Sequence, residues 1–350
     1  MAPTTQTVQV AAVVLFYMTA ALVMVFVNKA VLNNAPELPL LFLLIQLIIA
    51  VMLLHISAFV NKRVELPVVD RAAAGKLVPV VLVNIIGLVF NTLCLRDVDA
   101  TFFQIARGMV LPLTIFVSAL YTKVVPSVRI LGAAAVVTIG FLLGVVPHSF
   151  GQPTSSPSPS ILSLIYGLLS SVFIAVHAVL IKTSLPHCNN STIQLAWWTN
   201  VGSAIFLLPF VLLHGEISLL ISKTGDAQWN GYVFIWGCLI TGVFGFLLCI
   251  AGLLSIKVTS PITHMFSSAA KSVLQTVLGF LIFNDLLNMK RVTSILVIMS
   301  GTLYYTWMKH TEGGQKAAKQ NNDVEAVPLA SKSEEEEESM WQHSEGKIRN

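Results

Sequence analysis

The chain has 350 residues, 55% of them hydrophobic and 11% charged, with a mean hydropathy of +0.79. This composition excludes a soluble globular domain and indicates a polytopic membrane protein. The formal net charge of +4 is uneven, because residues 1–308 carry 15 Lys and Arg against 8 Asp and Glu, whereas residues 309–350 carry 6 against 9.

Residues 1–7 form a short N-terminus that lacks the basic n-region and small-residue cleavage site of a signal peptide. We therefore expect the first apolar run to be retained as a membrane span. Ten runs are long enough to cross a bilayer. They are residues 8–31, 38–60, 77–95, 101–121, 128–146, 161–181, 193–213, 229–255, 263–283 and 292–307.

The loops between these spans differ in positive charge. With the N-terminus in the cytosol, the cytosolic loops hold eight Lys and Arg and the loops on the other side hold four. Because cytosolic loops carry an excess of Lys and Arg, this bias predicts that both termini are cytosolic. We expect the acidic segment 309–350 to be a disordered cytosolic tail.

Residues 147–160 are rich in Pro and Ser and are predicted to form a lumenal linker between two five-span halves, 8–146 and 161–308. An odd number of spans gives the halves opposite orientations, as in inverted-repeat transporters. Aligning the halves at an offset of about 162 residues brings Arg107 within two residues of Lys271 and places Gly140 opposite Gly301. The sequence thus predicts an all-α membrane protein with ten transmembrane helices in two inverted repeats.

The charges inside the spans are all positive. Lys271 lies near the middle of the ninth span, Arg107 lies about two turns into the fourth, and Lys29 lies near the end of the first. A cation at the centre of a span costs at least about 2.5 kcal/mol and usually lines a polar cavity. Ser267 and Ser268, just before Lys271, leave room for a ligand, so we predict an anion-binding site.

A cavity with only one sign of charge also limits the mechanism. A proton-coupled carrier or an acid–base enzyme would need buried carboxylates, and no Asp or Glu lies deep in a span. Cations that repel one another in an empty cavity favour obligate exchange of anions. For Lys29 and Arg107 the alternative is that they extend to the headgroups from helix ends.

Residues 194–200 open the seventh span with aromatic, amide and hydroxyl side chains. Trp197, Trp198, Thr199 and Asn200 are typical of a nucleobase pocket, although the tryptophans also fit an interfacial belt. His264 lies two turns from Lys271 and is a further candidate for the cavity. The histidines show no metal-binding spacing, so we expect neither a metal nor a cofactor.

Several segments resemble the nucleotide-sugar transporters of the drug/metabolite transporter superfamily, most closely the GDP-fucose transporters. The resemblance rests on Met-Val-Phe-Val-Asn-Lys at 24–29, Asn-Thr-Leu-Cys-Leu-Arg at 91–96, residues 103–107, Phe-Gly-Phe at 244–246, Val-Thr-Ser-Pro-Ile-Thr-His at 258–264 and Ala-Lys-Ser-Val-Leu-Gln-Thr-Val-Leu at 270–278. It implies that Lys271 holds the phosphate-sugar end of the ligand and that Arg107 and Lys29 belong to the same pattern. The chain departs from the family at Trp197–Asn200, where guanosine-sugar transporters have Phe-Tyr-Asn-Asn, and at Ser268, where they have Gly.

This resemblance implies a Golgi membrane transporter that exchanges a cytosolic nucleotide sugar for a lumenal nucleoside monophosphate, with the endoplasmic reticulum as an alternative location. We expect a nucleotide sugar, a nucleoside monophosphate and the lipid bilayer as partners, no nucleic acid, and no enzymatic activity. GDP-fucose with GMP is the predicted pair. A UDP-sugar, a small phosphorylated sugar and an intramembrane transferase remain as alternatives, and the sequence leaves open whether the protein forms a homodimer.

Overall fold

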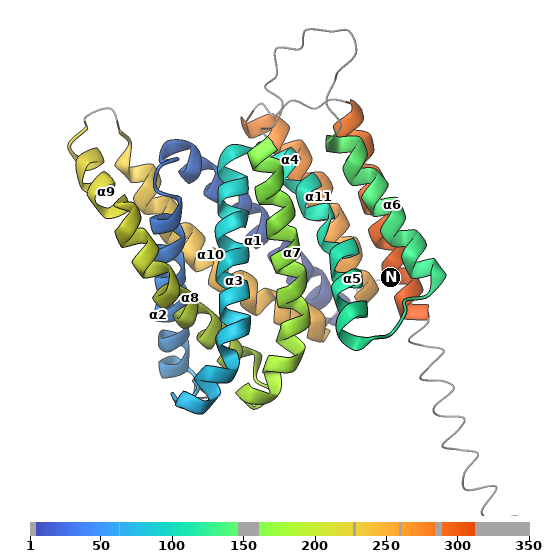
Figure 1. The fold of residues 1–350 in the computed structure, drawn as a ribbon, viewed down its shortest axis with the longest axis horizontal. Helices are drawn as coiled ribbons and strands as arrows, with labels where there is room; N and C mark the ends of the chain where they lie inside the picture. Colours follow the sequence, from blue (N-terminus) through green and yellow to red (C-terminus); the bar gives the residue numbers. More distant parts are fainter. Residues whose placement is uncertain are drawn as a thin grey trace, which may run out of the picture.

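The computed structural model describes residues 5–62, 64–145, 161–226, 229–258, 261–283 and 289–311, and it describes the backbone alone at residues 5–11, 13–14, 101, 182 and, within its range, 249–270. The predicted linker at 147–160 and nearly all of the tail at 309–350 lie outside these ranges. Every regular element in the described part of the chain is helical. The predicted all-α class is therefore confirmed (Figure 1).

The helices follow the apolar runs of the sequence closely. They are α1 (Thr5–Asn34), α2 (Pro39–Val60), α3 (Arg71–Asp97), α4 (Ala100–Gly108), α5 (Val110–Thr122), α6 (Val128–Val145), α7 (Ile161–Ser184), a 3-10 turn η1 (Leu185–Cys188), α8 (Thr192–His214), α9 (Glu216–Thr224), α10 (Gly231–Val258), α11 (Pro261–Phe283) and a final helix at residues 289–311.

Eight helical segments within the described ranges are long and apolar enough to cross a membrane. They correspond to the first eight predicted spans, including the seventh despite Pro209 inside α8. Residues 271–282 of α11 form a shorter apolar helix. The helix at 289–311 overlaps the predicted tenth span, so both remaining spans stay predictions.

The fourth predicted span is not one continuous helix, because the chain breaks at Met109 between α4 and α5. Pro112 has no N–H for the carbonyl of Gly108, one turn earlier, and its ring would crowd that carbonyl. The break leaves Arg107 in the last turn of α4, where the helix dipole favours a positive charge.

Acidic side chains cap several helices at one end of the bundle. Asp99 accepts a hydrogen bond from Phe102 N at the start of α4 (2.6 Å) and forms an ion pair with Arg291 (2.6 Å). Glu216 is fully buried at the start of α9 and accepts from Leu41 N at the start of α2 (2.6 Å). Burial raises the pKa of Glu216, and the N–H groups of Leu41 and Leu40 lower it in part.

The helix contacts repeat in a reciprocal pattern between the two halves. α3 packs along α7 as α1 packs along α10, α2 packs on α10 as α8 packs on α3, and α4 contacts α7 as α11 contacts α1. Each contact maps onto its counterpart when the first and second halves are exchanged in order.

The same reciprocity occurs at the crossing of α6 with residues 289–311, on the right of Figure 1. A Cβ added to Gly140 would lie 2.9 Å from Ile298, and one added to Gly301 would lie 2.7 Å from Val137. Ser294 Oγ donates to Gly140 O across the same contact (2.6 Å). The two glycines therefore allow the helix backbones to approach closely.

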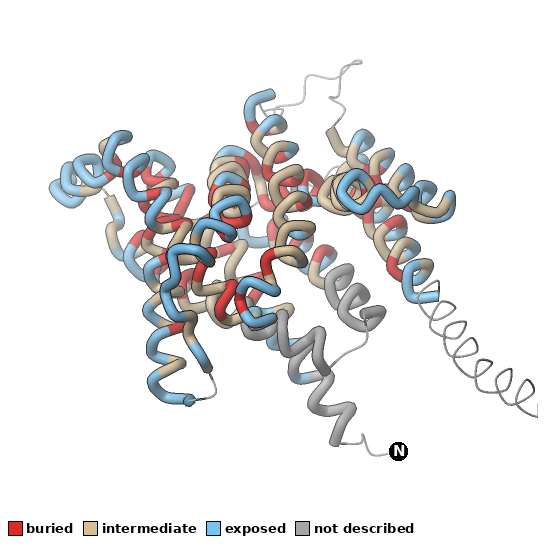
Figure 2. Tube along the Cα trace, turned by 60° about the horizontal axis from the view of Figure 1, so that its bottom comes forward, coloured by how far each residue is buried: buried red, intermediate tan, exposed pale blue. Residues whose placement is uncertain are grey.

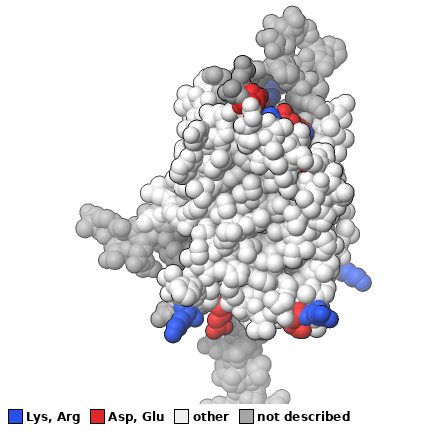
Figure 3. All heavy atoms as spheres, turned by 90° about the vertical axis from the view of Figure 1, so that its left-hand side faces the viewer, with Lys and Arg blue, Asp and Glu red and all other residues white. Residues whose placement is uncertain are grey.

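The outer surface of the bundle is apolar. Large hydrophobic side chains such as Phe59, Phe210 and Leu213 are exposed on it, and Figure 2 shows buried residues along the inner faces of the helices. Figure 3 shows a broad uncharged band between two charged edges on one face. Such a surface matches a hydrocarbon core between two headgroup layers, so the predicted membrane class is confirmed.

Candidate functional site

Two hydrogen bonds join α4 and α11 side by side. Gln104 Nε2 donates to Ser272 Oγ (2.7 Å), and Gln275 Nε2 donates to Ala100 O (3.2 Å). Arg107 lies one turn beyond Gln104, and Lys271 precedes Ser272. The seam between these helices therefore holds two cations close together in the bundle.

Because Gln104 and Ser272 are in contact, Arg107 and Lys271 lie near each other, and like charges repel. Lys271 Nζ lies 5.8 Å from the centroid of the Tyr17 ring, and Arg107 Cζ lies 5.6 Å from that of Phe103. Arg107 is exposed by its accessible surface, so a ligand can reach its guanidinium. Within the described part of the chain, its guanidinium has neither an ion pair nor a hydrogen bond, which leaves its donors available to an anion.

Lys29 is engaged differently. Its side chain is buried, and Nζ donates to Leu95 O (2.9 Å) and Arg96 O (3.0 Å) at the C-terminal end of α3. A cation there satisfies terminal carbonyls and interacts favourably with the helix dipole. In this conformation Lys29 joins α1 to α3, and its predicted part in ligand binding stays a prediction.

A cavity of about 220 Å³ lies between α1, α2, α3, α8 and α10. Its wall is mostly apolar, with side chains such as Met24, Leu47 and Phe246. Three polar side chains contribute to it, namely Gln46 of α2, Asn200 of α8 and Thr241 of α10. A mostly apolar pocket with a few polar groups is typical of a site for an organic ligand.

Among the four residues predicted at the start of the seventh span, Asn200 lines this cavity. Trp198 packs in a core cluster with α3, and Trp197 contacts Trp198 and His55. The Thr199 hydroxyl donates to carbonyls of its own helix. The structure therefore does not bring Trp197, Trp198 and Thr199 to the cavity wall.

His264, Ser267 and Ser268 lie in the first half of α11. Their side chains are outside the described residues, so their predicted place in the cavity stays a prediction.

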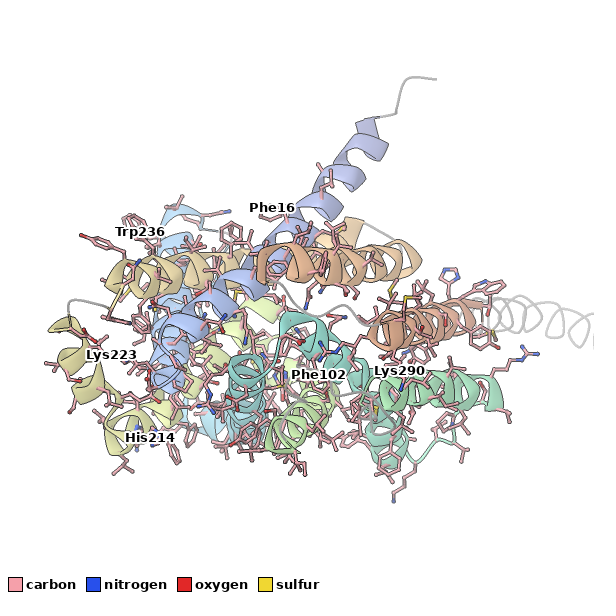
Figure 4. All side chains as sticks on the ribbon, turned by 90° about the horizontal axis from the view of Figure 1, so that it is seen from above. Phe16, Phe102, His214, Lys223, Trp236 and Lys290 are labelled. Carbon is pink, nitrogen blue, oxygen red and sulfur yellow. The ribbon has the colours of Figure 1, made fainter. Side chains whose placement is uncertain are left out.

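Sequence reasoning missed Tyr17, Gln46 and Thr241. The available signal was a polar side chain inside an apolar span, which is a weaker indication for an uncharged residue than for a lysine because it costs less to bury. Tyr17 and Met24 lie seven residues apart on one face of α1, about 10 Å along the axis. Viewed from above, α1 runs between α10 and α11 (Figure 4). It thus links the cavity at Met24 to the cation pair beside Tyr17.

Comparison with known proteins gives a consistent result. A model of the Triose-phosphate Transporter family matches residues 8–306. The chain is 29% identical to GDP-fucose transporter 1 of Dictyostelium discoideum, over 87% of this chain and 81% of that one. It is 28% identical to GDP-fucose transporter 1 of Mus musculus, over 87% and 84%.

A third relative carries a location in its name. The chain is 25% identical to "GDP-fucose transporter, Golgi" of Drosophila melanogaster, over 86% of this chain and 90% of that one. These similarities confirm the resemblance to nucleotide-sugar transporters that the sequence motifs indicated. Together with the apolar helices, they support a multi-pass Golgi membrane protein.

Proposed function

This chain belongs to the Triose-phosphate Transporter family, and we propose that it imports GDP-fucose into the Golgi lumen in exchange for GMP. Relatives named as GDP-fucose transporters, similar over most of the chain, support this substrate. The observation that carries the proposal is that Arg107 and Lys271 lie at the hydrogen-bonded seam of α4 and α11 inside a membrane bundle.

In this proposal the cation pair binds the phosphate groups. Arg107 offers planar N–H donors to two oxygens at once, and Lys271 supplies a compact point charge. Both charges attract phosphate, and this attraction strengthens as the bound ligand displaces water. GDP-fucose and GMP share the phosphate next to the ribose, so both ligands can use the pair.

The cation pair also accounts for exchange. Without an anion, Arg107 and Lys271 repel each other in a medium of low dielectric constant, so the empty carrier changes conformation slowly. A nucleotide on either side removes this repulsion. Each inward step with GDP-fucose is then followed by an outward step with GMP.

We further propose ten membrane helices in two inverted repeats, with both termini in the cytosol. The reciprocal helix contacts and the paired glycines at α6 and 289–311 support this architecture. Inverted repeats give two related conformations, open to opposite sides of a central site. The Lys29 bonds to α3, the Glu216 cap of α2 and the Arg291–Asp99 ion pair all lie at the end that this topology assigns to the lumen.

The family's description favours a second candidate substrate, a small phosphorylated sugar. Such a ligand would use the cation pair but would leave the apolar cavity with Gln46 and Asn200 without a role. We therefore place a nucleobase in the cavity and the phosphates at the cations.

The test uses purified protein in liposomes preloaded with GMP, UMP, CMP or AMP. Uptake of labelled GDP-fucose, a UDP-sugar and a triose phosphate is measured in each. We expect GDP-fucose with internal GMP to exchange fastest. Uptake of a UDP-sugar against UMP, with none for GDP-fucose, would contradict the proposed substrate, and uptake of the triose phosphate alone would favour the second candidate.

A further inference from the structure

We propose that Gln46 of α2 reads the nucleobase, and that Gln46 and Asn200 together present two carbonyl acceptors that select guanine. The inference rests on the proposed function and goes beyond it by assigning base selection to particular side chains. Both side chains line the cavity between α1, α2, α3, α8 and α10. Hydrogen bonds to the surrounding groups fix the orientation of each amide, and these orientations carry the inference.

Both N–H groups of the Gln46 side-chain amide donate hydrogen bonds within the protein. Nε2 donates to Asn28 Oδ1 (2.8 Å) and to Thr241 Oγ1 (2.7 Å). The Thr241 hydroxyl donates its own proton to Gly237 O (2.7 Å), so it can only accept from Gln46. A flipped Gln46 would therefore face an oxygen that has no proton to give.

This arrangement leaves the Gln46 carbonyl oxygen as the free hydrogen-bonding group. Oε1 accepts no hydrogen bond from the described residues, and it is not fully buried. Because Gln46 lines the cavity, we infer that the accessible surface of Oε1 faces it.

Asn200 is oriented by an equally simple constraint. Its Nδ2 donates to Ala196 O (2.7 Å), one turn earlier in α8. A backbone carbonyl only accepts, so the amide nitrogen must point to it and Oδ1 must point away. Within the described residues Oδ1 has no donor, and Asn200 also lines the cavity.

Two carbonyl acceptors match guanine better than the other bases. The edge of guanine carries two neighbouring donors, N1–H and the 2-amino group, whereas uracil has a single ring N–H there and adenine has one amino group. A base with fewer donors leaves a desolvated carbonyl unpaired, which weakens its binding. The cavity is thus expected to prefer guanine by hydrogen bonding rather than by shape alone.

The experiment measures how well GMP, IMP and pyrophosphate inhibit GDP-fucose uptake by the wild type and by Gln46→Met. IMP lacks the 2-amino group, and pyrophosphate has no base. Met has a similar length without the amide, so we expect GMP inhibition to weaken at least about tenfold. Pyrophosphate inhibition should stay unchanged, because it reports on the cation pair.

The IMP result identifies which donor Gln46 reads. An equal loss for GMP and IMP assigns it to N1–H, and a loss for GMP alone assigns it to the 2-amino group, so either result supports the proposal. Unchanged GMP inhibition, or equal losses for GMP and pyrophosphate, would overturn it. Absence of GDP-fucose uptake by the wild type would instead count against the proposed function.

A further variant addresses folding. Asn84→Ala removes an amide–hydroxyl hydrogen bond of similar kind between α3 and α8 (Asn84 Nδ2 to Ser203 Oγ, 3.1 Å), at residues that do not line the cavity. It should lower thermal stability without changing the ratio of GMP to IMP inhibition.

Discussion

Arg107 and Lys271 are the two residues whose removal should affect transport most. Each cation is expected to donate charge-assisted hydrogen bonds to phosphate, worth about 1.5–3 kcal/mol apiece. Lys271→Ala and Arg107→Ala should therefore lower the rate of exchange at low substrate concentration by at least about tenfold. The measurement is GDP-fucose uptake into GMP-loaded liposomes, beside a thermal unfolding curve in detergent.

Lys309 provides a matched control for Lys271. Its Nζ also lies over a tyrosine ring, 5.5 Å from the centroid of Tyr305, but it is exposed near the end of the final helix. Lys309→Ala should leave exchange unchanged. Wild-type exchange by correctly folded Lys271→Ala protein would remove Lys271 from the binding site.

The residues differ in how well the sequence predicted them. A lysine in an apolar run is costly, so composition alone singled out Lys271. Aligning the two halves of the sequence then placed Arg107 within two residues of the equivalent position in the first half. Gln46 could not be identified in this way, because its role depends on Asn28 and Thr241 from two other helices. Lys29 was predicted from its position, but its partners on α3 come from the tertiary fold.

At the level of the elements, the crossing of α6 with residues 289–311 depends on glycine. A Cβ at position 301 would lie 2.7 Å from Val137 Cγ2, so Gly301→Ala should force the helices apart. We expect a loss of about 1–3 kcal/mol in stability, seen as a lower unfolding temperature in detergent. Gly132→Ala in α6 is the control, because a Cβ there has no neighbour within 4 Å.

The two alanine variants give a direct comparison. Gly132→Ala should be neutral or slightly stabilising, because alanine favours the helix. Equal stability of Gly301→Ala and Gly132→Ala would contradict the close approach of α6 and residues 289–311 at Gly301.

Helix positions were predictable because long apolar runs have few alternatives in a bilayer. The break at Met109 was not predicted, although Gly108 and Pro112 are its cause, because hydropathy ignores the backbone hydrogen bonds that a proline removes. The short helix α9 was missed because its length and mixed polarity resemble a loop.

On the scale of the whole molecule, the reciprocal contacts between the halves support a carrier that alternates between two related conformations. The sequence indicated this through the odd number of spans in each half and the faint match of Gly140 with Gly301. It could not indicate the contacts of Lys29, Glu216 and Arg291 at one end of the bundle, because their partners lie far away in the chain.

The central claim is that the cation pair of Arg107 and Lys271 enforces exchange without proton coupling. The most direct measurement compares uptake of labelled GDP-fucose into liposomes that contain GMP with uptake into empty liposomes, each with and without a protonophore. We predict rapid uptake with internal GMP, little uptake into empty liposomes, and no effect of the protonophore. Equal uptake into empty liposomes, or loss of uptake on addition of the protonophore, would contradict it.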